Sequence, residues 1–402
     1  MVKFLMILMM GVYGLSNADE PNEKKVSLPD GLNNFAWELF KEIGTEEKNT
    51  VISPYSIASS LSFAASGAKG QTQQQINKTL HLYQDQNTIN KTFGQWQNSL
   101  NTTLSQQDLQ FVIANALWMQ KDTNILPSFM KIAKENYKAI VRDVDFVGSS
   151  LIATQAMNKW VKEATQGKIQ DLLQSGDVDA STRMVLLNAI SMKALWQYPF
   201  NTEKNQAGSF FNENGQTVSA TFMNETETLP FIQTDNWSLL QLPYRKPVNG
   251  PELVMTIVLP KDENGFYDMI QSLSLQQIQQ KMYDVQMERV LVQIPKFKFT
   301  YRVGLKSALE ALGMQEPFTT NADFSGINGL TNLSISKVLH EAFISVDESG
   351  TEAAAATSVN ISLKSVLEEK KPIVFRADHP FLFLIYDKSN GLVLFIGKVV
   401  NL

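Results

Sequence analysis

Two long apolar runs constrain the fold of this chain more than any other feature. They span Leu109–Gln120 and Thr182–Trp196. A strand that is covered on both faces has this pattern, so we expect both runs to be central strands of a sheet. Three later segments, 252–260, 289–303 and 332–348, alternate more clearly between apolar and polar residues, which indicates further strands.

Helical patterns dominate the first half of the chain. Leu32–Ile43 places its apolar residues on one stripe, with Asp30 as a candidate cap. Ser53–Ser66 has Pro54 at its first helical position and carries no charge on any face, so we expect this helix to be buried on all sides. The C-terminal stretch 381–400 is instead typical of a hairpin of two apolar strands. Helices first and sheets later indicate the α+β class.

The composition fits one large globular domain. The chain has 402 residues, of which 44% are hydrophobic and 19% charged. Length alone would allow two or three domains, but no linker rich in Pro, Gly or Ser divides the chain, so we expect a single domain over residues 19–402. The net charge of -5 argues against a nucleic-acid partner, because neutralising phosphates needs a basic surface.

The N-terminus predicts a secretory signal peptide. Lys3 is followed by the apolar stretch 4–12 and then by Ser16 and Ala18, a small-x-small cleavage pattern. The apolar stretch is too short for a transmembrane helix, which needs about 20 apolar residues. We therefore expect a signal peptide over residues 1–18, a secreted, extracellular protein, and no membrane partner.

The chain contains no cysteine, although the secretory route permits disulfides. A cysteine nucleophile and thiolate metal sites are therefore excluded. Asn-x-Ser/Thr sequons are acceptors of N-glycans in secreted proteins. The candidate glycosylation sites are Asn77, Asn90, Asn101, Asn224, Asn236 and Asn332.

No set of residues for enzyme chemistry can be assembled from the sequence. The three histidines are His81, His340 and His379, and His340 lacks the second histidine of a zinc-protease helix. No G-x-S-x-G elbow, P-loop or G-x-G-x-x-G motif occurs. Scattered Asp and Glu residues are typical of solvated faces. We therefore expect neither an enzyme nor a metal site.

The segment Asp347–Ser365 combines two patterns. Its four consecutive alanines, Ala353–Ala356, favour a helix, yet the residues that follow alternate as in a strand. Counting by twos puts the bulky residues on the same face as every second residue of the alanine run, so the segment is patterned as a half-buried strand. That face carries Thr351, Ala353, Ala355, Thr357, Val359, Ile361 and Leu363, and the other carries Glu352, Ser358, Asn360 and Ser362.

Several stretches resemble the serpin family of serine protease inhibitors. Residues 346–357 resemble the hinge of an inhibitory serpin's reactive-centre loop, and residues 49–72 resemble the family's second helix. Residues 186–200 resemble its strand block, and 375–385 with 394–401 resemble its C-terminal signature. The resemblance covers almost the whole mature chain. It implies the serpin fold, an α+β fold with three β-sheets, about nine helices and an exposed reactive-centre loop at about 348–376.

The strand block departs from the family pattern at two places. Ser191-Met192 stands where an aromatic pair is usual, and Ala194 stands where glycine is usual. Both are local packing changes. The cysteine-free chain with its leader resembles extracellular arthropod serpins.

The resemblance implies a suicide inhibitor whose loop is cleaved and then inserts into the main sheet. Counting seventeen positions from Glu348 places the reactive bond at Lys364–Ser365, and a lysine there suits a trypsin-like serine protease. The segment after Ser365 is a few residues longer than in many relatives. Cleavage at Leu367, Glu369, Lys370 or Lys371 therefore stays open, and with it a chymotrypsin-like or elastase-like target. The implied hinge consists of Glu348, Gly350, Thr351, Glu352, Ala353, Ala354, Ala355, Ala356 and Thr357.

Two further groups of residues follow from the resemblance. The shutter, a polar cluster under the middle of the main sheet, corresponds to Ser53, Ser56, Asn188 and His340. The breach, where the loop enters the sheet, corresponds to Trp196, Lys296 and Glu348, with an expected ion pair between Lys296 and Glu348. Asn360 is a sequon inside the loop, and we expect it to be unoccupied or to face solvent.

Cofactors and partners complete these expectations. Some serpins are accelerated by heparin-like polyanions, and Lys131, Lys134, Lys138 and Arg142 follow at helical spacing, with Lys159, Lys162 and Lys168 after them. Such a run is more often a solvated face, so we assign no cofactor. We expect a monomer that forms a covalent acyl complex with its protease. A non-inhibitory serpin, such as a carrier, storage protein or chaperone, is the alternative, although the alanine-rich hinge argues against it.

Overall fold

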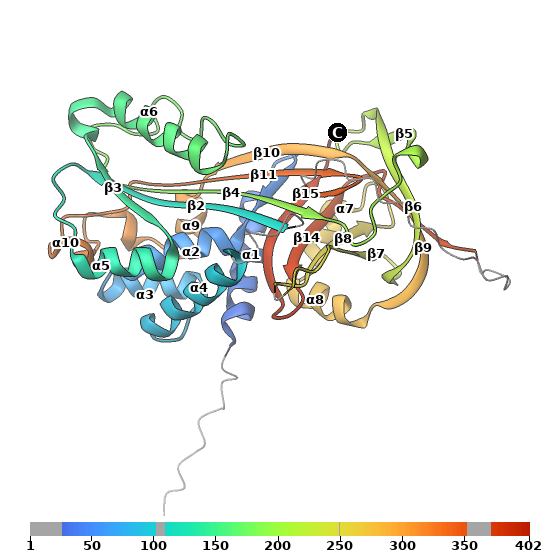
Figure 1. The fold of residues 1–402 in the computed structure, drawn as a ribbon, viewed down its shortest axis with the longest axis horizontal. Helices are drawn as coiled ribbons and strands as arrows, with labels where there is room; N and C mark the ends of the chain where they lie inside the picture. Colours follow the sequence, from blue (N-terminus) through green and yellow to red (C-terminus); the bar gives the residue numbers. More distant parts are fainter. Residues whose placement is uncertain (1–25, 102–108, 249, 352–370) are drawn as a thin grey trace, which may run out of the picture.

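Two β-sheets and ten α-helices make up the part of the chain that the structure describes. This part comprises residues 26–101, 109–248, 250–351 and 371–402 of a computed structural model. Long strands cross the molecule with helices packed on both sides (Figure 1). The predicted α+β class is confirmed. The predicted signal peptide, residues 1–18, lies outside the described residues.

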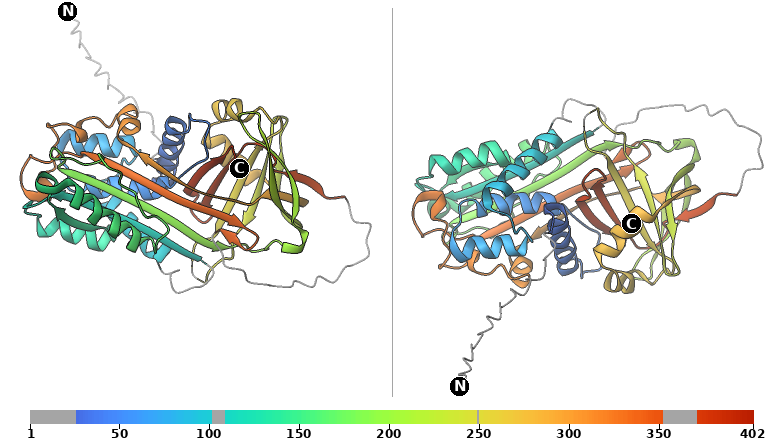
Figure 2. Two further views of the ribbon diagram at one scale, coloured as in Figure 1. Left: turned by 90° about the horizontal axis from the view of Figure 1, so that it is seen from above. Right: turned by 90° about the horizontal axis from the view of Figure 1, so that it is seen from below.

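Six strands form what we call the main sheet. The two predicted central strands, β2 and β4, are neighbours in it, and β4 also pairs with β11; the three strands run along the length of the molecule (Figure 2). The first strand, β2, spans the predicted run to the residue. The order is β10 (Phe297–Gly304), β11 (Lys337–Asp347), β12 (Gly350–Thr351), β4 (Met184–Leu195), β2 (Leu109–Gln120) and β3 (Ile140–Val144).

The second sheet contains the C-terminal hairpin that the sequence predicted. Its long strand β6 pairs with β5 and β9 along most of its length and with β7 at its end. This continuity joins two of the three expected sheets into one hydrogen-bonded path. The order is β1 (Thr50–Ile52), β15 (Leu392–Val399), β14 (Phe381–Asp387), β8 (Leu253–Pro260), β7 (Trp237–Pro243), β6 (Thr217–Gln233), β9 (Gln286–Pro295) and β13 (Ile373–Arg376), with β5 (Gln206–Phe211) beside β6.

The helices cover the two faces of the main sheet. Helix α6 lies over one face, and α2 to α5 lie against the other (Figure 1). Every residue of α2 is buried, as its uncharged sequence predicted. The helices are α1 (Leu28–Ile43), α2 (Pro54–Ala65), α3 (Gly70–Thr79), α4 (Gln86–Asn101), α5 (Pro127–Ile132), α6 (Phe146–Ala164), α7 (Phe266–Ser272), α8 (Leu275–Asp284), α9 (Lys306–Ala311) and α10 (Ser325–Asn328).

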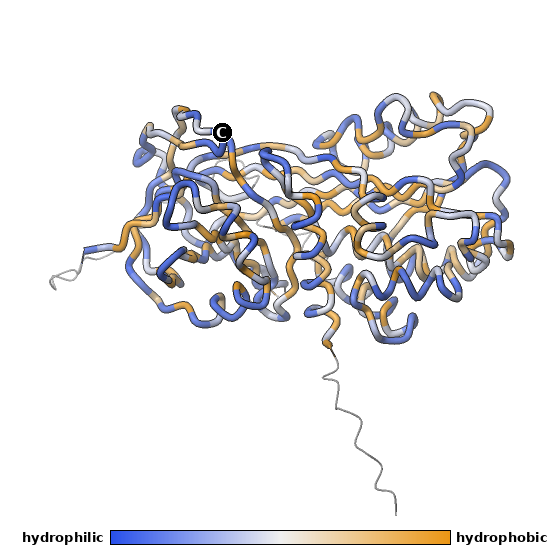
Figure 3. The backbone as a smooth tube through the Cα atoms, turned by 180° about the vertical axis from the view of Figure 1, so that it is seen from behind, coloured by the Kyte–Doolittle hydropathy of each residue, from blue (hydrophilic) through white to orange (hydrophobic). Residues whose placement is uncertain are grey.

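Strand β4 divides two apolar cores. Its side chains alternate, so Leu186 and Ile190 join the large core toward α2, and Leu187 and Ala189 join a smaller core under α6. Orange, hydrophobic stretches accordingly run through the strands in the middle of the molecule (Figure 3). A strand buried on both faces explains why the 182–196 run shows no apolar–polar alternation.

Two local predictions were wrong. The cap of α1 is Ser27, whose Oγ accepts the N–H of Asp30, so Asp30 lies in the first turn. The basic run 131–142 is not one helix, because α5 ends at Ile132, a π-helix follows, and Lys138 has a left-handed φ of 49°. Its four cations therefore do not share a helical face. Within the described residues, no helix has the length and apolar character to span a membrane.

Candidate functional site

The main sheet contains a fork between β4 and β11. The two strands pair in parallel from Lys337–Val185 up to Phe343–Ser191, and their direct pairing ends there. Beyond that point the two-residue strand β12 lies between them, antiparallel to both. The sheet is thus closed in its middle and already opened at one end by residues of the predicted hinge.

The turn that leads into β12 is held by the backbone around it. The carboxylate of Asp347 accepts the N–H groups of Ser349 at 2.8 Å and Gly350 at 3.3 Å. Gly350 has a φ of 155°, and a Cβ there would lie 2.0 Å from the carbonyl oxygen of Ala194. Only glycine fits so close an approach between β12 and β4.

Trp196 and Tyr244 form an aromatic platform beneath the hinge. Their rings stack with centroids 4.5 Å apart, and the indole N–H of Trp196 donates to the carbonyl of Asp347 at 3.0 Å. The hydroxyls of Tyr244 and Thr351 are 2.6 Å apart, so the side chain of Thr351 points into the core. Burial raises the pKa of Tyr244, which keeps its hydroxyl neutral.

The breach contains the predicted ion pair. Lys296 Nζ lies 3.0 Å from Glu348 Oε1, and Asn205 donates a second hydrogen bond to the same oxygen. Burial by itself opposes ionisation of Glu348, but the hydrogen bonds from Asn205 and Lys296 outweigh it and hold the pKa of Glu348 below its usual value. Glu348 is only 8% exposed, so this pair ties the hinge to β10 and to the strand that precedes it.

The four predicted shutter residues form one buried network. The N–H of Ser53 donates to Nε2 of His340 at 3.2 Å, so Nδ1 carries the proton and donates to Asn188. The amide of Asn188 donates to Ser56, and Ser53 caps α2 through the N–H of Ser56 at 3.2 Å. His340 and Asn188 are register partners on β11 and β4, so parting these strands breaks the network.

Asn115 is a member of this network that sequence reasoning missed. It lies opposite Asn188 on β2, accepts hydrogen bonds from Asn188 and from Ser60 at 2.9 Å, and is buried. An asparagine inside the apolar run 109–120 was the available signal, because a buried amide needs partners. The network thus crosses three adjacent strands at one level.

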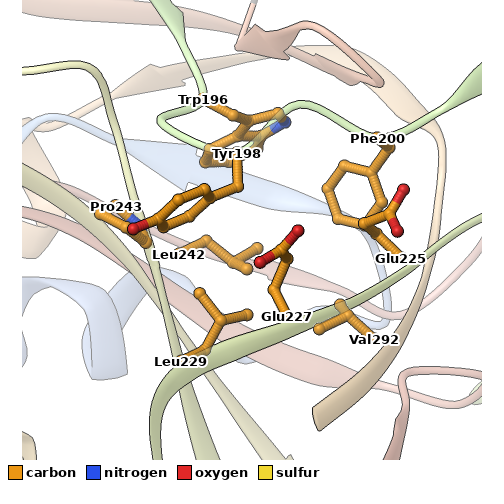
Figure 4. Close-up of a pocket in the computed structure, with 9 residues that line it drawn as sticks. All are labelled: Trp196, Tyr198, Phe200, Glu225, Glu227, Leu229, Leu242, Pro243 and Val292. Carbon is orange, nitrogen blue, oxygen red and sulfur yellow. The ribbon is translucent and has the colours of Figure 1, made fainter. Parts of the chain in front are cut away.

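Trp196 also lines a narrow, largely apolar pocket (Figure 4). Tyr198 and Phe200 line it with the carboxylates of Glu225 and Glu227. Burial, and then the nearby charge of Glu225, raise the pKa of Glu227. In the described part of the chain, no group of three or more His, Cys, Asp or Glu side chains is arranged to hold a metal.

Several predicted site residues lie outside the described residues. These are the reactive bond Lys364–Ser365, the hinge residues Glu352–Thr357, and the alternative cleavage positions 367–370. Lys371 is described and exposed, just before β13. The side chain of Asn101 is also outside the described set.

Two of the predicted glycosylation sites do not fit the structure. Asn90 and Asn224 are each only 5% exposed, and their amides are hydrogen bonded inside the protein. A glycan needs an accessible amide nitrogen, so these two predictions are corrected. Asn236 and Asn332 are exposed, and Asn77 is partly buried.

Comparisons with known proteins identify the family. The sequence model described as "Serpin (serine protease inhibitor)" matches residues 30–402. The chain is a serpin. The serpin-like protein of Thermococcus kodakarensis is 36% identical over 95% of this chain and 87% of its own. The leukocyte elastase inhibitor of Xenopus laevis is 35% identical over 92% of this chain and 98% of its own.

Solved serpin structures share the fold. Serpin48 of the insect Tenebrio molitor, described as a highly specific serpin, superposes with a TM-score of 0.83 at 30% identity over 95% of this chain and 100% of its own. Human thyroxine-binding globulin, solved as a complex, gives the same TM-score at 29% identity over 94% and 99%. The family therefore agrees with a protease inhibitor rather than an enzyme and with a serine protease as the partner class.

The relatives overturn the expected extracellular location. The leukocyte elastase inhibitors of Xenopus laevis, Sus scrofa, Homo sapiens and Mus musculus match 90–92% of this chain and 96–98% of their own. Their own chains lie almost wholly within the match, which leaves them little room for a leader of the length predicted here. These relatives indicate a protein that is not secreted. The expectation of a secreted, extracellular protein is therefore wrong.

Lowering the pH from about 7.5 to about 5 should destabilise the folded serpin through His340. Burial lowers the pKa of His340 to about 3 from the ordinary 6.5. Between these values the unfolded chain binds a proton that the folded chain does not. The contribution of neutral His340 to the free energy of unfolding is therefore fully present above pH 6.5, and it is lost as the pH falls below 6.5. The expected loss at pH 5 is about 2 kcal/mol, at about 1.4 kcal/mol per pH unit, and thermal unfolding measured across this range checks it.

His379 provides a control of opposite sign. Burial opposes its protonation, but hydrogen bonds to Asp378 and to the carbonyl of Pro260 outweigh burial and raise its pKa. The stabilisation of the folded protein by protonated His379 is fully present below the pKa that this group has in the unfolded chain. It is lost as the pH rises through the higher pKa of the folded protein. His340→Asn should remove the destabilisation below pH 6.5, and His379→Gln should leave it in place. An unchanged pH slope in the His340 variant would contradict the assignment.

Glu348→Lys should release the hinge from the breach. The substitution puts two ammonium groups where an ion pair now lies, and we expect it to cost about 1–3 kcal/mol, because the glutamate is buried but Lys296 is partly exposed. The variant should unfold at a lower temperature and self-associate on mild heating, as measured by size-exclusion chromatography. Glu310→Lys, which reverses the charge in an exposed pair with Lys306, should do neither. A Glu348 variant that stays monomeric and as stable as the parent refutes the role of the pair.

Proposed function

We propose that this serpin inhibits trypsin-like serine proteases as a suicide substrate. The protease attacks the Lys364–Ser365 bond and forms an acyl-enzyme with the new carboxyl end. The cleaved loop then enters the main sheet between β4 and β11 and carries the protease with it. The observation that supports this most is β12, where Gly350 and Thr351 already lie between the two strands that must part.

The pairing of β12 predicts the register of insertion. Thr351 lies opposite Val346 on β11 and Ala194 on β4, and each later residue would move one place back along both strands. Six residues further along, Thr357 would lie between His340 and Asn188. A hydroxyl at that position can replace part of the hydrogen bonding that parting the strands would break.

The alternation of the loop fits the same register. Thr351 points toward Tyr244 in the core, so every second residue after it would also face the core. The sequence places Ala353, Ala355, Thr357 and then larger apolar residues at those positions. Burying three branched side chains is worth roughly 1.5–3 kcal/mol each. That stabilisation would drive insertion once cleavage frees the loop.

Two alternatives keep specific support. A later scissile bond at positions 367–371 would favour a chymotrypsin-like or elastase-like target, and the relatives named leukocyte elastase inhibitors fit that reading. A non-inhibitory carrier is the second, because thyroxine-binding globulin shares the fold and was solved with its ligand. Comparing the melting temperatures of intact and loop-cleaved protein separates inhibitor from carrier, since only an inserting loop adds a strand.

The remaining expectations accompany this proposal. We propose one domain over residues 19–402 that acts as a monomer, needs no cofactor, and has neither nucleic acid nor membrane as partner. The sequence offered Lys131, Lys134, Lys138 and Arg142 as a possible polyanion site, to which we assigned no cofactor. These four residues do not share a helix, which weakens that possibility further.

Lys364→Ala should abolish the covalent complex with trypsin. The trypsin S1 pocket selects a long cation, so removing it should lower the rate of complex formation by at least about 100-fold. Denaturing gels of trypsin incubated with each variant measure the complex, and N-terminal sequencing of the released peptide locates the cut. Lys371→Ala, which removes the exposed lysine before β13, should form complexes like the parent. If complexes persist with the Lys364 variant and vanish with the Lys371 variant, the reactive bond follows Lys371 and the assignment to Lys364 is wrong.

A further inference from the structure

A cleft of about 350 Å³ lies over the fork on the side of the main sheet that faces α6. Residues of β4 and β11 form its floor on the two sides of the fork, and the turn after α6 forms one wall. Its polar and charged lining includes Ser191 and Lys193 of β4, Ser345 and Asp347 of β11, Lys298 of β10, and Lys168 after α6.

Three lysines surround this cleft. Lys298 and Lys168 place their Nζ atoms 5.6 and 5.9 Å from the ring centre of Phe343, which belongs to the last pair before the fork. Lys193 lies on the opposite side of the fork, on β4. The cleft therefore presents positive charge from both sides of the place where the strands separate.

One carboxylate shares the lining. Asp347 uses Oδ1 to accept the N–H groups of Ser349 and Gly350, so that oxygen is engaged with the hinge turn. Among the described residues that line the cleft, three are lysines and one is a carboxylate. Hydroxyl groups of Ser191 and Ser345 add hydrogen-bond donors to the floor.

We propose that this cleft binds a short oligophosphate. Lysine is a point-charge binder of phosphate, and cations on several sides favour a ligand with several charges over a monovalent one. The volume suits a chain of a few phosphate groups.

The effect of this ligand on inhibition rests on the proposed function, in which the cleaved loop enters the main sheet between β4 and β11. An oligophosphate held by Lys193 and Lys298 spans the fork and links β4 to the strands on the other side. A strand that enters between β4 and β11 in the register of β12 would place its first alternate side chains against the same cleft. The bound ligand therefore stabilises the uninserted form and slows insertion, because it binds one state in preference to the other.

Isothermal titration with inorganic tripolyphosphate tests the site directly. We expect micromolar binding with one ligand per chain in low-salt buffer, and at least tenfold weaker binding in Lys193→Gln and in Lys298→Gln. Lys131→Gln, which removes a lysine far from the cleft, should bind like the parent. Circular dichroism confirms that each variant is folded. Absence of binding by the parent, or an equal loss in the Lys131 variant, overturns the proposal.

A kinetic experiment then tests the regulation. Saturating tripolyphosphate should slow trypsin complex formation by the parent at least fivefold and leave Lys193→Gln unchanged. A parent that binds the ligand but reacts at an unchanged rate overturns the regulatory role. The titration does not depend on any protease, so it tests the binding site even if the protein forms no complex with trypsin. The absence of any complex would refute the proposed function alone.

Discussion

The parallel pairing of β4 with β11 is the interaction on which the rest of this structure depends. It closes the main sheet as far as Phe343 and Ser191, and the hinge occupies the gap beyond. Ladder hydrogen bonds are worth only about 1 kcal/mol each after solvent exchange. The pairing is therefore held by what packs on its two faces, which are the polar network toward α2 and the apolar core under α6. An entering strand would replace the hydrogen bonds of the ladder between β4 and β11. Its side chains would also have to fit against the apolar core under α6 and give hydrogen-bond partners to the polar network toward α2.

The polar network favours the fully closed pairing of β4 with β11 over partly opened arrangements of the two strands. Asn115, Asn188 and His340 lie at one level of three adjacent strands. Their side chains bond to serines of α2 and its N-cap, His340 and Asn188 at the N-terminus and Asn115 in the middle of the helix. Buried polar groups cost free energy unless every partner is in place. A partly opened sheet leaves several of these groups unsatisfied at once, so intermediate positions of the loop are disfavoured. A hydroxyl arriving at the level of His340 is then worth more than its single hydrogen bond suggests, because it completes a network.

Much of the architecture could be predicted from the sequence because its strongest signals are local. Helix α2 and strands β2 and β4 follow directly from the absence of charge and the length of their apolar runs. The shutter and breach followed from the family resemblance. Predictions failed where a distant partner decides the outcome. Asn205 and Asn115 carry no local sign of the groups they contact, and the buried amides of Asn90 and Asn224 look like ordinary sequons until the tertiary fold covers them.

The two faces of the fork place different demands on the strand that enters. The face toward Tyr244 is apolar and closely packed, so the first residues on that side must be small, and threonine and alanine meet this need. The face under α6 near the fork is wide, polar and lined by lysines. Residues with small or polar side chains, and one glutamate, occupy the alternate positions of the segment after Thr351. Under the proposed mechanism, insertion would therefore begin where the sheet accepts small side chains and the lysines favour one negative charge. It would meet its main resistance at the level of His340, about six residues after Thr351 in the register of β12.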